Sequence, residues 1–190
     1  MSPSPGTTAY EFRRRKLAAG EARCAVFRRT YDADVRDVWN ACTDPERLRR
    51  WYAPVEGDLV LGGRFTQGDF GPGSVIRCEP PNHLRVALGE ADPATDEINL
   101  TLTANAAGTL LEFEHATTLD THTIGGQIFD AVYCMGGGYG PRLVTLGEYL
   151  SGSLPVGLDP ATLHLRGEYR AAITDSMAAL QDLLIANKEL

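Results

Sequence analysis

The chain has 190 residues, of which 43% are hydrophobic and 23% are charged; these proportions are typical of one well-cored globular domain and exclude a disordered chain. Its net charge of −7 argues against nucleic acid as a partner, because neutralising phosphates requires a basic surface. No apolar run approaches the roughly 20 residues that span a bilayer, so we expect no membrane partner.

The four cysteines indicate neither a metal site nor a disulfide framework. They stand at positions 24, 42, 78 and 134, and no two of them have the C-x-x-C spacing of a zinc site. Because the first residues carry no apolar run behind a positive start, we expect no secretory signal, and hence reduced thiols in the cytoplasm. The glycine-rich stretch 136–140 lacks the G-K-[ST] ending of a phosphate loop, so no cofactor is predicted.

The first thirty residues predict a short helix and then a strand. Residues 10–17 are expected to form the helix, with the basic run 13–16 on its solvated face. Residues 23–31 alternate between apolar and polar side chains and are rich in β-forming types. They are therefore predicted to form the first strand.

Two short helices are predicted next, each with a recognisable start. Asp34 can cap a helix that ends near Cys42, since apolar side chains follow at helical spacing. Asp44 followed by Pro45 is a typical beginning for a second helix, which runs toward Trp51.

Residues 55–118 predict about six consecutive strands. Short alternating segments are separated by turn signals, among them Gly62-Gly63, Pro80-Pro81 and Asp92-Pro93. The segment around Leu100 alternates with polar residues, which is typical of a half-buried antiparallel strand. A hairpin with Leu59 and Leu61 on its first strand is expected at Gly62-Gly63.

The last third is predicted to be helical. Apolar residues step by three and four along one helix face: Ile128, Val132, Met135, Tyr139, Leu143, Leu146 and Leu150. The glycines at 136–140 and Pro141 predict a broken or kinked element, with the firm helix starting near Pro141. After a linker at 151–158, a last helix is predicted over 160–186.

The apolar stripe of that last helix must be buried, because an amphipathic helix gains most of its stability from packing. Its members are Tyr169, Ile173, Met177, Leu180 and Leu184. Two packing arrangements are possible. The helix returns onto its own domain over Trp39 and the short helices, or it packs on a second copy in a homodimer.

This order of elements predicts an α+β fold rather than alternating β-α-β units. We expect a helix-grip fold, in which a strongly bent antiparallel sheet wraps around a long C-terminal helix, with two short helices after the first strand and an extra C-terminal helix. The domain is predicted to occupy residues 22–152, between an N-terminal extension (1–21) and a C-terminal helical extension (153–190).

Five blocks of residues occur in order along the chain. They are Tyr31 to Trp51; Gly57-Asp58-Leu59 with Gly62-Gly63-Arg64-Phe65; Gly73 with Val75, Glu79-Pro80-Pro81 and Leu84; Gly108 to Leu111 with Phe113 and His115; and Gly137-Gly138-Tyr139 with Leu143, Leu146 and Tyr149-Leu150-Ser151-Gly152. Together they resemble the START-like (SRPBCC) superfamily, and more narrowly the branch related to the activator of the ninety-kilodalton heat-shock-protein ATPase. The resemblance covers residues 22–152 and implies the fold more firmly than any function. One departure is Tyr139, where family members often carry Trp; its hydroxyl would add a polar group to a pocket wall.

The leading hypothesis is therefore a protein that binds a small hydrophobic metabolite in an internal cavity of about 300–1,000 Å³. His115 ends an inward-facing series after Leu111 and Phe113, so it is either a hydrogen-bonded core histidine or a polar group at the pocket wall. The candidate ligand-binding residues are Trp51, Phe65, Leu100, Phe113, His115, Val132, Tyr133, Met135 and Tyr139.

Two other functions stay open. One is an enzyme of the polyketide cyclase or dehydratase type, with His115 and either Tyr133 or Tyr139 as acid and base. The other is a protein-binding module like the chaperone-ATPase activator. The sequence contains no complete catalytic motif, so the catalytic candidates are limited to His115 and Tyr139.

Overall fold

The computed structural model describes residues 6–189, and its dominant element is one eight-stranded antiparallel sheet. The strand order across the sheet is β1-β2-β8-β7-β6-β5-β4-β3. The strands are β1 (Thr8–Leu17), β2 (Gly20–Tyr31), β3 (Val55–Gly57), β4 (Arg64–Gln67), β5 (Pro72–Glu79), β6 (His83–Leu88), β7 (Asp96–Asn105) and β8 (Gly108–Thr117).

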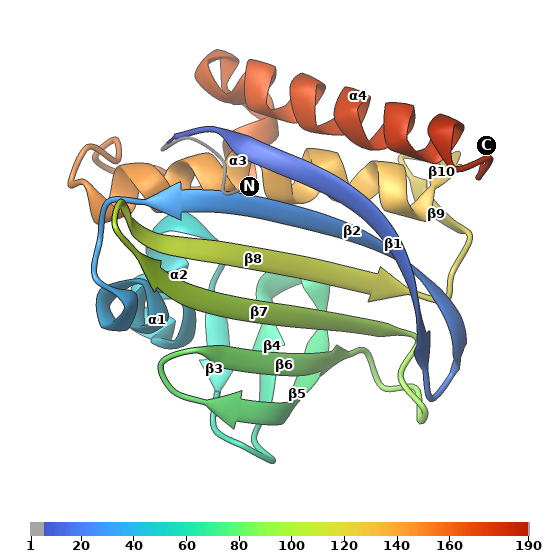
Figure 1. Cartoon of the computed structure of the whole chain (residues 1–190), viewed down its shortest axis with the longest axis horizontal. Coiled ribbons are helices and arrows are strands. Elements are labelled where there is room, and N and C mark those ends of the chain that lie inside the picture. The colour runs from blue at the N-terminus through green and yellow to red at the C-terminus, as the bar shows by residue number, and fades with distance from the viewer. Residues whose placement is uncertain (1–5, 190) are drawn as a thin grey trace.

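The helices cover one face of this curved sheet (Figure 1). The long helices α3 and α4 lie side by side along β1 and β2, and the short helices α1 and α2 pack near one end. The expected α+β helix-grip architecture is confirmed. The helices are α1 (Val35–Thr43), α2 (Pro45–Trp51), α3 (Ala131–Leu150) and α4 (Arg170–Ala186), with 3-10 turns η1 (Gly68–Phe70), η2 (Pro160–Leu165) and η3 (Gly167–Tyr169).

The predicted starts of α1 and α2 are confirmed in detail. The Asp34 carboxylate accepts a hydrogen bond from the backbone N–H of Arg36, and the Asp44 carboxylate accepts one from that of Glu46. Each cap satisfies a backbone donor that has no partner inside the helix. Pro45, which has no N–H to satisfy, occupies the first turn of α2.

The predicted helix over residues 10–17 is wrong, because this segment is strand β1. It pairs with β2 along its whole length, from Thr8 opposite Arg29 to Leu17 opposite Gly20. The basic run is not a solvated helix face. Arg13 and Arg15 form ion pairs with Glu114 of β8, two strands away. Residues 8–21, expected to precede the domain, thus belong to its sheet.

Of the two forms predicted for the closing helix, a break with the firm part starting near Pro141 is wrong. α3 runs from Ala131 to Leu150 with Pro141 inside it. Its glycines allow another helix to approach: a Cβ at Gly136 would lie 2.8 Å from the backbone oxygen of Ser176, and one at Gly140 only 2.6 Å from the oxygen of Ala172. Packing against α4 therefore accounts for these glycines, and the helix needs no break. Ile128, assigned to the same helix face, lies instead on strand β10 (Gln127–Asp130), before the helix begins.

The last helix docks onto its own chain, although not over Trp39 as expected. α4 packs on α3 and on β1, and the Tyr10 hydroxyl is hydrogen bonded to that of Ser176 at 2.7 Å. Within the stripe, Tyr169, Leu180 and Leu184 are fully buried. The first ten residues of the predicted helix form the turns η2 and η3.

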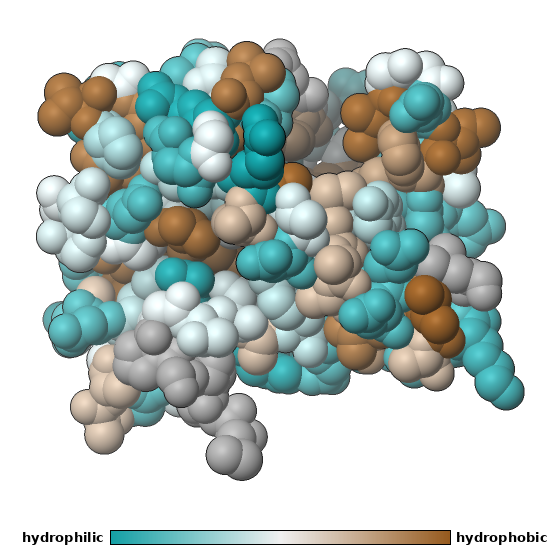
Figure 2. All heavy atoms as spheres, turned by 90° about the horizontal axis from the view of Figure 1, so that it is seen from above, coloured by the Kyte–Doolittle hydropathy of each residue, from teal (hydrophilic) through white to brown (hydrophobic). Residues whose placement is uncertain are grey.

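Two local features differ from the sequence-based expectation. Residues 58–63 form a loop between β3 and β4, and Leu61 is exposed, so the strand expected around Leu59 and Leu61 ends before them. A small separate hairpin, β9 (Thr121–Ile124) and β10 (Gln127–Asp130), leads into α3. In the view from above, apolar residues form separate patches among polar ones (Figure 2).

We expect Gly140→Ala to lower the free energy of unfolding by about 1–3 kcal/mol, because the added methyl group overlaps Ser176 and Ala172 and forces α4 outward. Gly138→Ala is the matched control. The same methyl group meets open space there, so the gain in helix propensity should stabilise the protein by about 0.5–1 kcal/mol. Urea denaturation measures both changes, and equal stabilisation by the two substitutions would contradict the close packing of α3 on α4.

Candidate functional site

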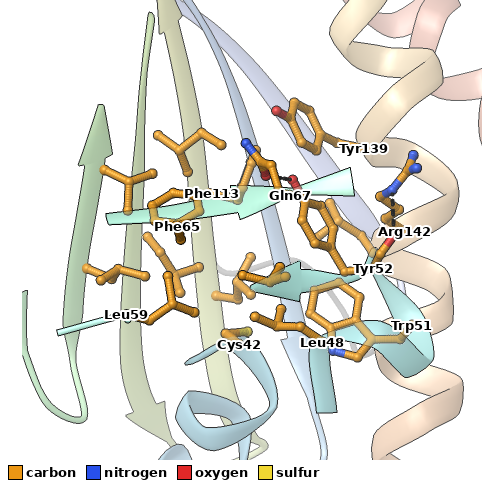
Figure 3. A pocket seen from close by; sticks show the side chains of 17 residues that line it. Cys42, Leu48, Trp51, Tyr52, Leu59, Phe65, Gln67, Phe113, Tyr139 and Arg142 are labelled. Atoms are coloured by element: carbon orange, nitrogen blue, oxygen red, sulfur yellow. Dashed lines mark hydrogen bonds between the residues drawn. The ribbon is translucent and has the colours of Figure 1, made fainter. Parts of the chain in front are cut away.

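A cavity lies between the sheet and the helices α2 and α3 (Figure 3). Its sheet wall is apolar, because alternate residues of each strand point to the same face. Those side chains are Phe65 of β4, Leu84 and Val86 of β6, Ile98 and Leu100 of β7, and Leu111 and Phe113 of β8.

Helix α2 forms the floor of the cavity with Leu48 and Trp51. The Trp51 indole donates a hydrogen bond from Nε1 to the carbonyl oxygen of Ala41, at 2.9 Å. The carbonyl oxygen of Trp51 in turn accepts a hydrogen bond from the hydroxyl of Thr145 on α3, at 2.8 Å. These two bonds hold the floor against α1 and α3.

The cavity encloses about 90 Å³, which is smaller than the range of about 300–1,000 Å³ expected for drug-sized ligands. The rings of Trp51, Phe65, Phe113 and Tyr139 line it and fill much of the space under the sheet. The volume still exceeds that of one water molecule, about 30 Å³. A ligand of drug size therefore requires these rings to move.

A hydrogen-bonded chain of three side chains reaches the cavity from the sheet. Asp96 of β7 contacts His115 of β8, with Oδ1 3.1 Å from Nε2. The other ring nitrogen, Nδ1, lies 2.9 Å from the hydroxyl of Tyr139 on α3. Tyr139 lines the cavity and also packs on Phe113, with ring centroids 4.4 Å apart. His115 is thus connected to the cavity through Tyr139.

The surroundings of Asp96 and Tyr139 determine the charges of these two side chains. Burial alone would raise the pKa of the Asp96 carboxyl, but hydrogen bonding and charge interaction with His115, helped by Thr95 and Thr117, hold it below its ordinary value. Burial raises the pKa of the Tyr139 phenol well above its ordinary value. An ionised carboxylate can only accept hydrogen bonds, so Nε2–H of His115 donates to Asp96.

A second set of polar side chains, from Tyr52, Gln67 and Arg142, lines the cavity near Tyr139. The Tyr52 hydroxyl donates to Oε1 of Gln67 at 2.8 Å. Arg142, three residues after Tyr139 on α3, lines the same cavity. Its guanidinium lies over the Tyr52 ring, 5.7 Å from the centroid. Figure 3 shows Tyr139 and Arg142 on the α3 side, with Phe65 and Leu59 on the opposite side.

The structure gathers five of the predicted ligand-binding residues around the cavity: Trp51, Phe65, Leu100, Phe113 and Tyr139. The remaining four lie elsewhere. His115 is buried behind the hydrogen bond to Tyr139, and Val132 and Met135 are buried core residues. Tyr133 stacks on Phe129 of β10, with ring centroids 6.4 Å apart.

Several polar residues of the site, among them Arg142, Asp96 and Gln67, were not selected from the sequence. Arg142 could have been found, because residues three apart on a helix share a face and Tyr139 was already a candidate. Asp96 could not, because its approach to His115 depends on the register of β7 against β8, in which Ile98 is opposite His115. Gln67 depends on the pairing of β4 in the same way.

A bent antiparallel sheet closed by a long C-terminal helix around an apolar cavity defines the helix-grip, SRPBCC-type class. A family model described as "Activator of Hsp90 ATPase homolog 1-like protein" matches residues 32–138. The chain therefore belongs to this family.

Two solved structures of CalU16 from Micromonospora echinospora are similar over nearly the whole chain. The solution structure is 34% identical, with a TM-score of 0.80, and the match covers 96% of this chain and 98% of that one. The crystal structure is 32% identical, with a TM-score of 0.74 and coverage of 94% and 98%. Since the likeness extends past residue 138, these structures share more than the family core.

A more distant structure shares the fold alone. The Aha1 dimer from Colwellia psychrerythraea is 17% identical, with a TM-score of 0.58, and covers 68% of this chain and 97% of that one. No curated protein matches the chain. Among residues 6–189, the helices fall short of the length and apolarity needed to span a membrane, and no group of three His, Cys, Asp or Glu side chains in that range could hold a metal ion.

We expect Asp96→Asn to lower the free energy of unfolding at pH 7 by about 1–2 kcal/mol, because it weakens a buried, charge-assisted hydrogen bond to His115. Since the folded-state pKa of Asp96 is depressed, this stabilisation is present above the unfolded pKa of about 4 and is lost as the pH falls through the folded value. Urea denaturation at pH 7 and pH 3 should show the difference shrink. Asp182→Asn, at an exposed position of α4, is the control with no expected change.

Proposed function

We propose that the protein binds a small, predominantly apolar molecule in the cavity, as a carrier, a sequestering protein or a sensor. The observation that carries this proposal is the apolar wall formed by alternate residues of β4, β6, β7 and β8. Moving apolar surface from water to such a wall is favourable by about 25 cal/mol per Å². The helix-grip class supports the proposal, because its sheet and closing helix surround the binding space.

The two sides of the wall are held in different ways. Phe65 and Phe113 project from strands and are held by packing, with the Phe113 ring 4.4 Å from that of Tyr139. Beneath the wall, hydrogen bonds fix Trp51 to Ala41 and to Thr145. A ligand larger than the cavity would therefore displace rings from the sheet side, while the helical side keeps its place.

To test binding, neutral apolar probes (1-naphthol, indole and decanol) are titrated into the protein by calorimetry. We expect Val86→Phe to weaken binding at least tenfold, because the larger ring takes up cavity volume. Ile76→Phe, at an exposed position of β5, should leave the affinity unchanged. Native mass spectrometry of freshly purified protein then identifies any retained molecule. If none of the neutral probes binds the wild-type protein, the proposed function is wrong.

One observation favours a second candidate function, an enzyme of the cyclase or dehydratase type. The chain Asp96–His115–Tyr139 can move a proton between the cavity and a buried base. Tyr139 oxygen takes a proton from the substrate while its own proton passes to Nδ1 of His115, and ionised Asp96 stabilises the resulting imidazolium. Reversing these steps delivers the proton to a leaving hydroxyl, which departs as water, so the relay ends in its starting state.

The enzyme hypothesis predicts that Tyr139→Phe and His115→Gln each lower dehydration of a β-hydroxy thioester, which carries the leaving hydroxyl, by about 10²-fold or more. Tyr133→Phe is the matched control, because Tyr133 is on the same helix but stacks on Phe129, and it should retain full activity. Product formation is followed by chromatography with mass detection. Equal losses in all three variants, or no turnover by wild type, would reject the enzymatic role.

A further inference from the structure

Arg142 is a cation in the wall of an otherwise apolar cavity. It lines the space together with Phe113 and Leu143, and it is partly buried. Among the side chains that the structure describes, which do not include that of Asp69, no carboxylate forms an ion pair with its guanidinium, and its hydrogen bonds go to backbone carbonyls. Burial lowers the pKa of this guanidinium from its ordinary value, despite interactions with Tyr52 and Tyr139. It nevertheless stays protonated at neutral pH.

The hydrogen bonds of Arg142 leave part of the guanidinium free. Nε donates to the carbonyl oxygen of Tyr52 at 3.2 Å, and Nη1 donates to that of Gly138 at 2.6 Å. Of the five N–H groups of a guanidinium, two are used in this way. Nη2 has no acceptor among the described residues. A planar group with free N–H donors is suited to bind both oxygens of a carboxylate.

Two aromatic rings place this cation between the cavity and the surface. Its guanidinium carbon lies 5.7 Å from the ring centroid of Tyr52 and 4.9 Å from that of Phe70. Tyr52 lines the cavity, whereas Phe70 is 53% exposed. An anion bound there would keep contact with water, which limits the cost of removing its charge from solvent. Its apolar body would extend along the sheet wall.

Arg47 is a comparable arginine whose charge is paired with a carboxylate of the same fold. It also lies over an aromatic ring, 5.2 Å from the centroid of Tyr149, and it donates to the Tyr149 hydroxyl. In addition, its Nη1 is 2.8 Å from Oδ1 of Asp37. Ring packing and backbone or hydroxyl hydrogen bonds are thus common to both arginines, and the carboxylate partner is what distinguishes them.

We infer that Arg142 binds the carboxylate of the ligand, so that the cavity takes an amphipathic organic acid with an aromatic or aliphatic body. This inference rests on the proposed function and specifies the class of ligand. The carboxylate pairs with the free edge of Arg142, and the body packs on Phe65, Phe113 and Leu100. Tyr139, on the same helix face, supplies a second polar contact for a ligand that carries a further oxygen.

The test compares acids with uncharged amides of the same skeleton: 1-naphthoate with 1-naphthamide, and decanoate with decanamide. Calorimetry at pH 7 should show each acid bound at least tenfold more tightly than its amide by the wild-type protein. Arg142→Gln should weaken acid binding at least tenfold and change amide binding less than twofold. Arg47→Gln, the matched control, should keep the full preference for acids. Arg142→Lys, which keeps the charge without the planar fork, should keep part of it.

Three outcomes distinguish the possible failures. Equal affinity of the wild-type protein for acids and amides overturns the carboxylate site and leaves the proposed function standing. An equal loss of both probe types in Arg142→Gln means that the residue only supports the wall. Failure of the wild-type protein to bind the neutral probes and the amides overturns the proposed function itself, whether or not the acids bind. If Arg142→Gln does not fold, the acid preference of wild type and Arg142→Lys still decides, since the preference for decanoate must decrease as the pH is lowered and this acid becomes protonated.

Discussion

The fold depends on the position of α3, which is packed from two sides at once. On one side α4 approaches closely because Gly136 and Gly140 have no side chain to keep it away. On the other side, the Tyr31 hydroxyl of β2 donates to the carbonyl oxygen of Leu143 at 2.9 Å. These contacts hold the helix against the sheet near β2 and leave the space under β4 to β8 to rings and cavity. The cavity is therefore a consequence of where α3 is fixed.

Because α3 is fixed, the two walls of the site have separate roles. The helix presents Tyr139 and Arg142, whose polar atoms need precise partners in a medium of low polarity. The strands present apolar side chains that only need to fill space. Substitutions on the strands could therefore alter the shape of the cavity without displacing the polar groups.

Local sequence signals predicted the elements that are stabilised locally. The caps of α1 and α2 are made by residues within two positions of the groups they bind, and the strands between residues 55 and 118 show their alternation directly. Strand β1 was missed because its basic residues are paired with Glu112 and Glu114, about a hundred positions away. Nothing in a short window distinguishes those arginines from the solvated face of a helix.

In the site, too, local patterns predicted some residues, and others depend on contacts between distant parts of the chain. Strand alternation identified Phe65, Leu100 and Phe113 on the cavity wall, and helical spacing identified Tyr139. The contact between Asp96 and His115 depends on strand register, which hydrophobic pattern alone leaves open between neighbouring strands. Gly136 and Gly140 predicted an interrupted helix when the sequence was considered alone. In the structure they allow α4 to pack closely on a continuous α3.

The position of α4 has a further consequence for the behaviour of the chain in a crowded solution. The sheet has two edges, β1 and β3, and β3 has only three residues. β1 has ten, and a long strand with unpaired backbone groups is a template for joining another sheet. α4 packs along β1, with Tyr10 bonded to Ser176 and Arg14 paired with Glu189. The C-terminal helix thus shields the longer edge from self-association, and shortened forms of the chain would be prone to aggregate through β1.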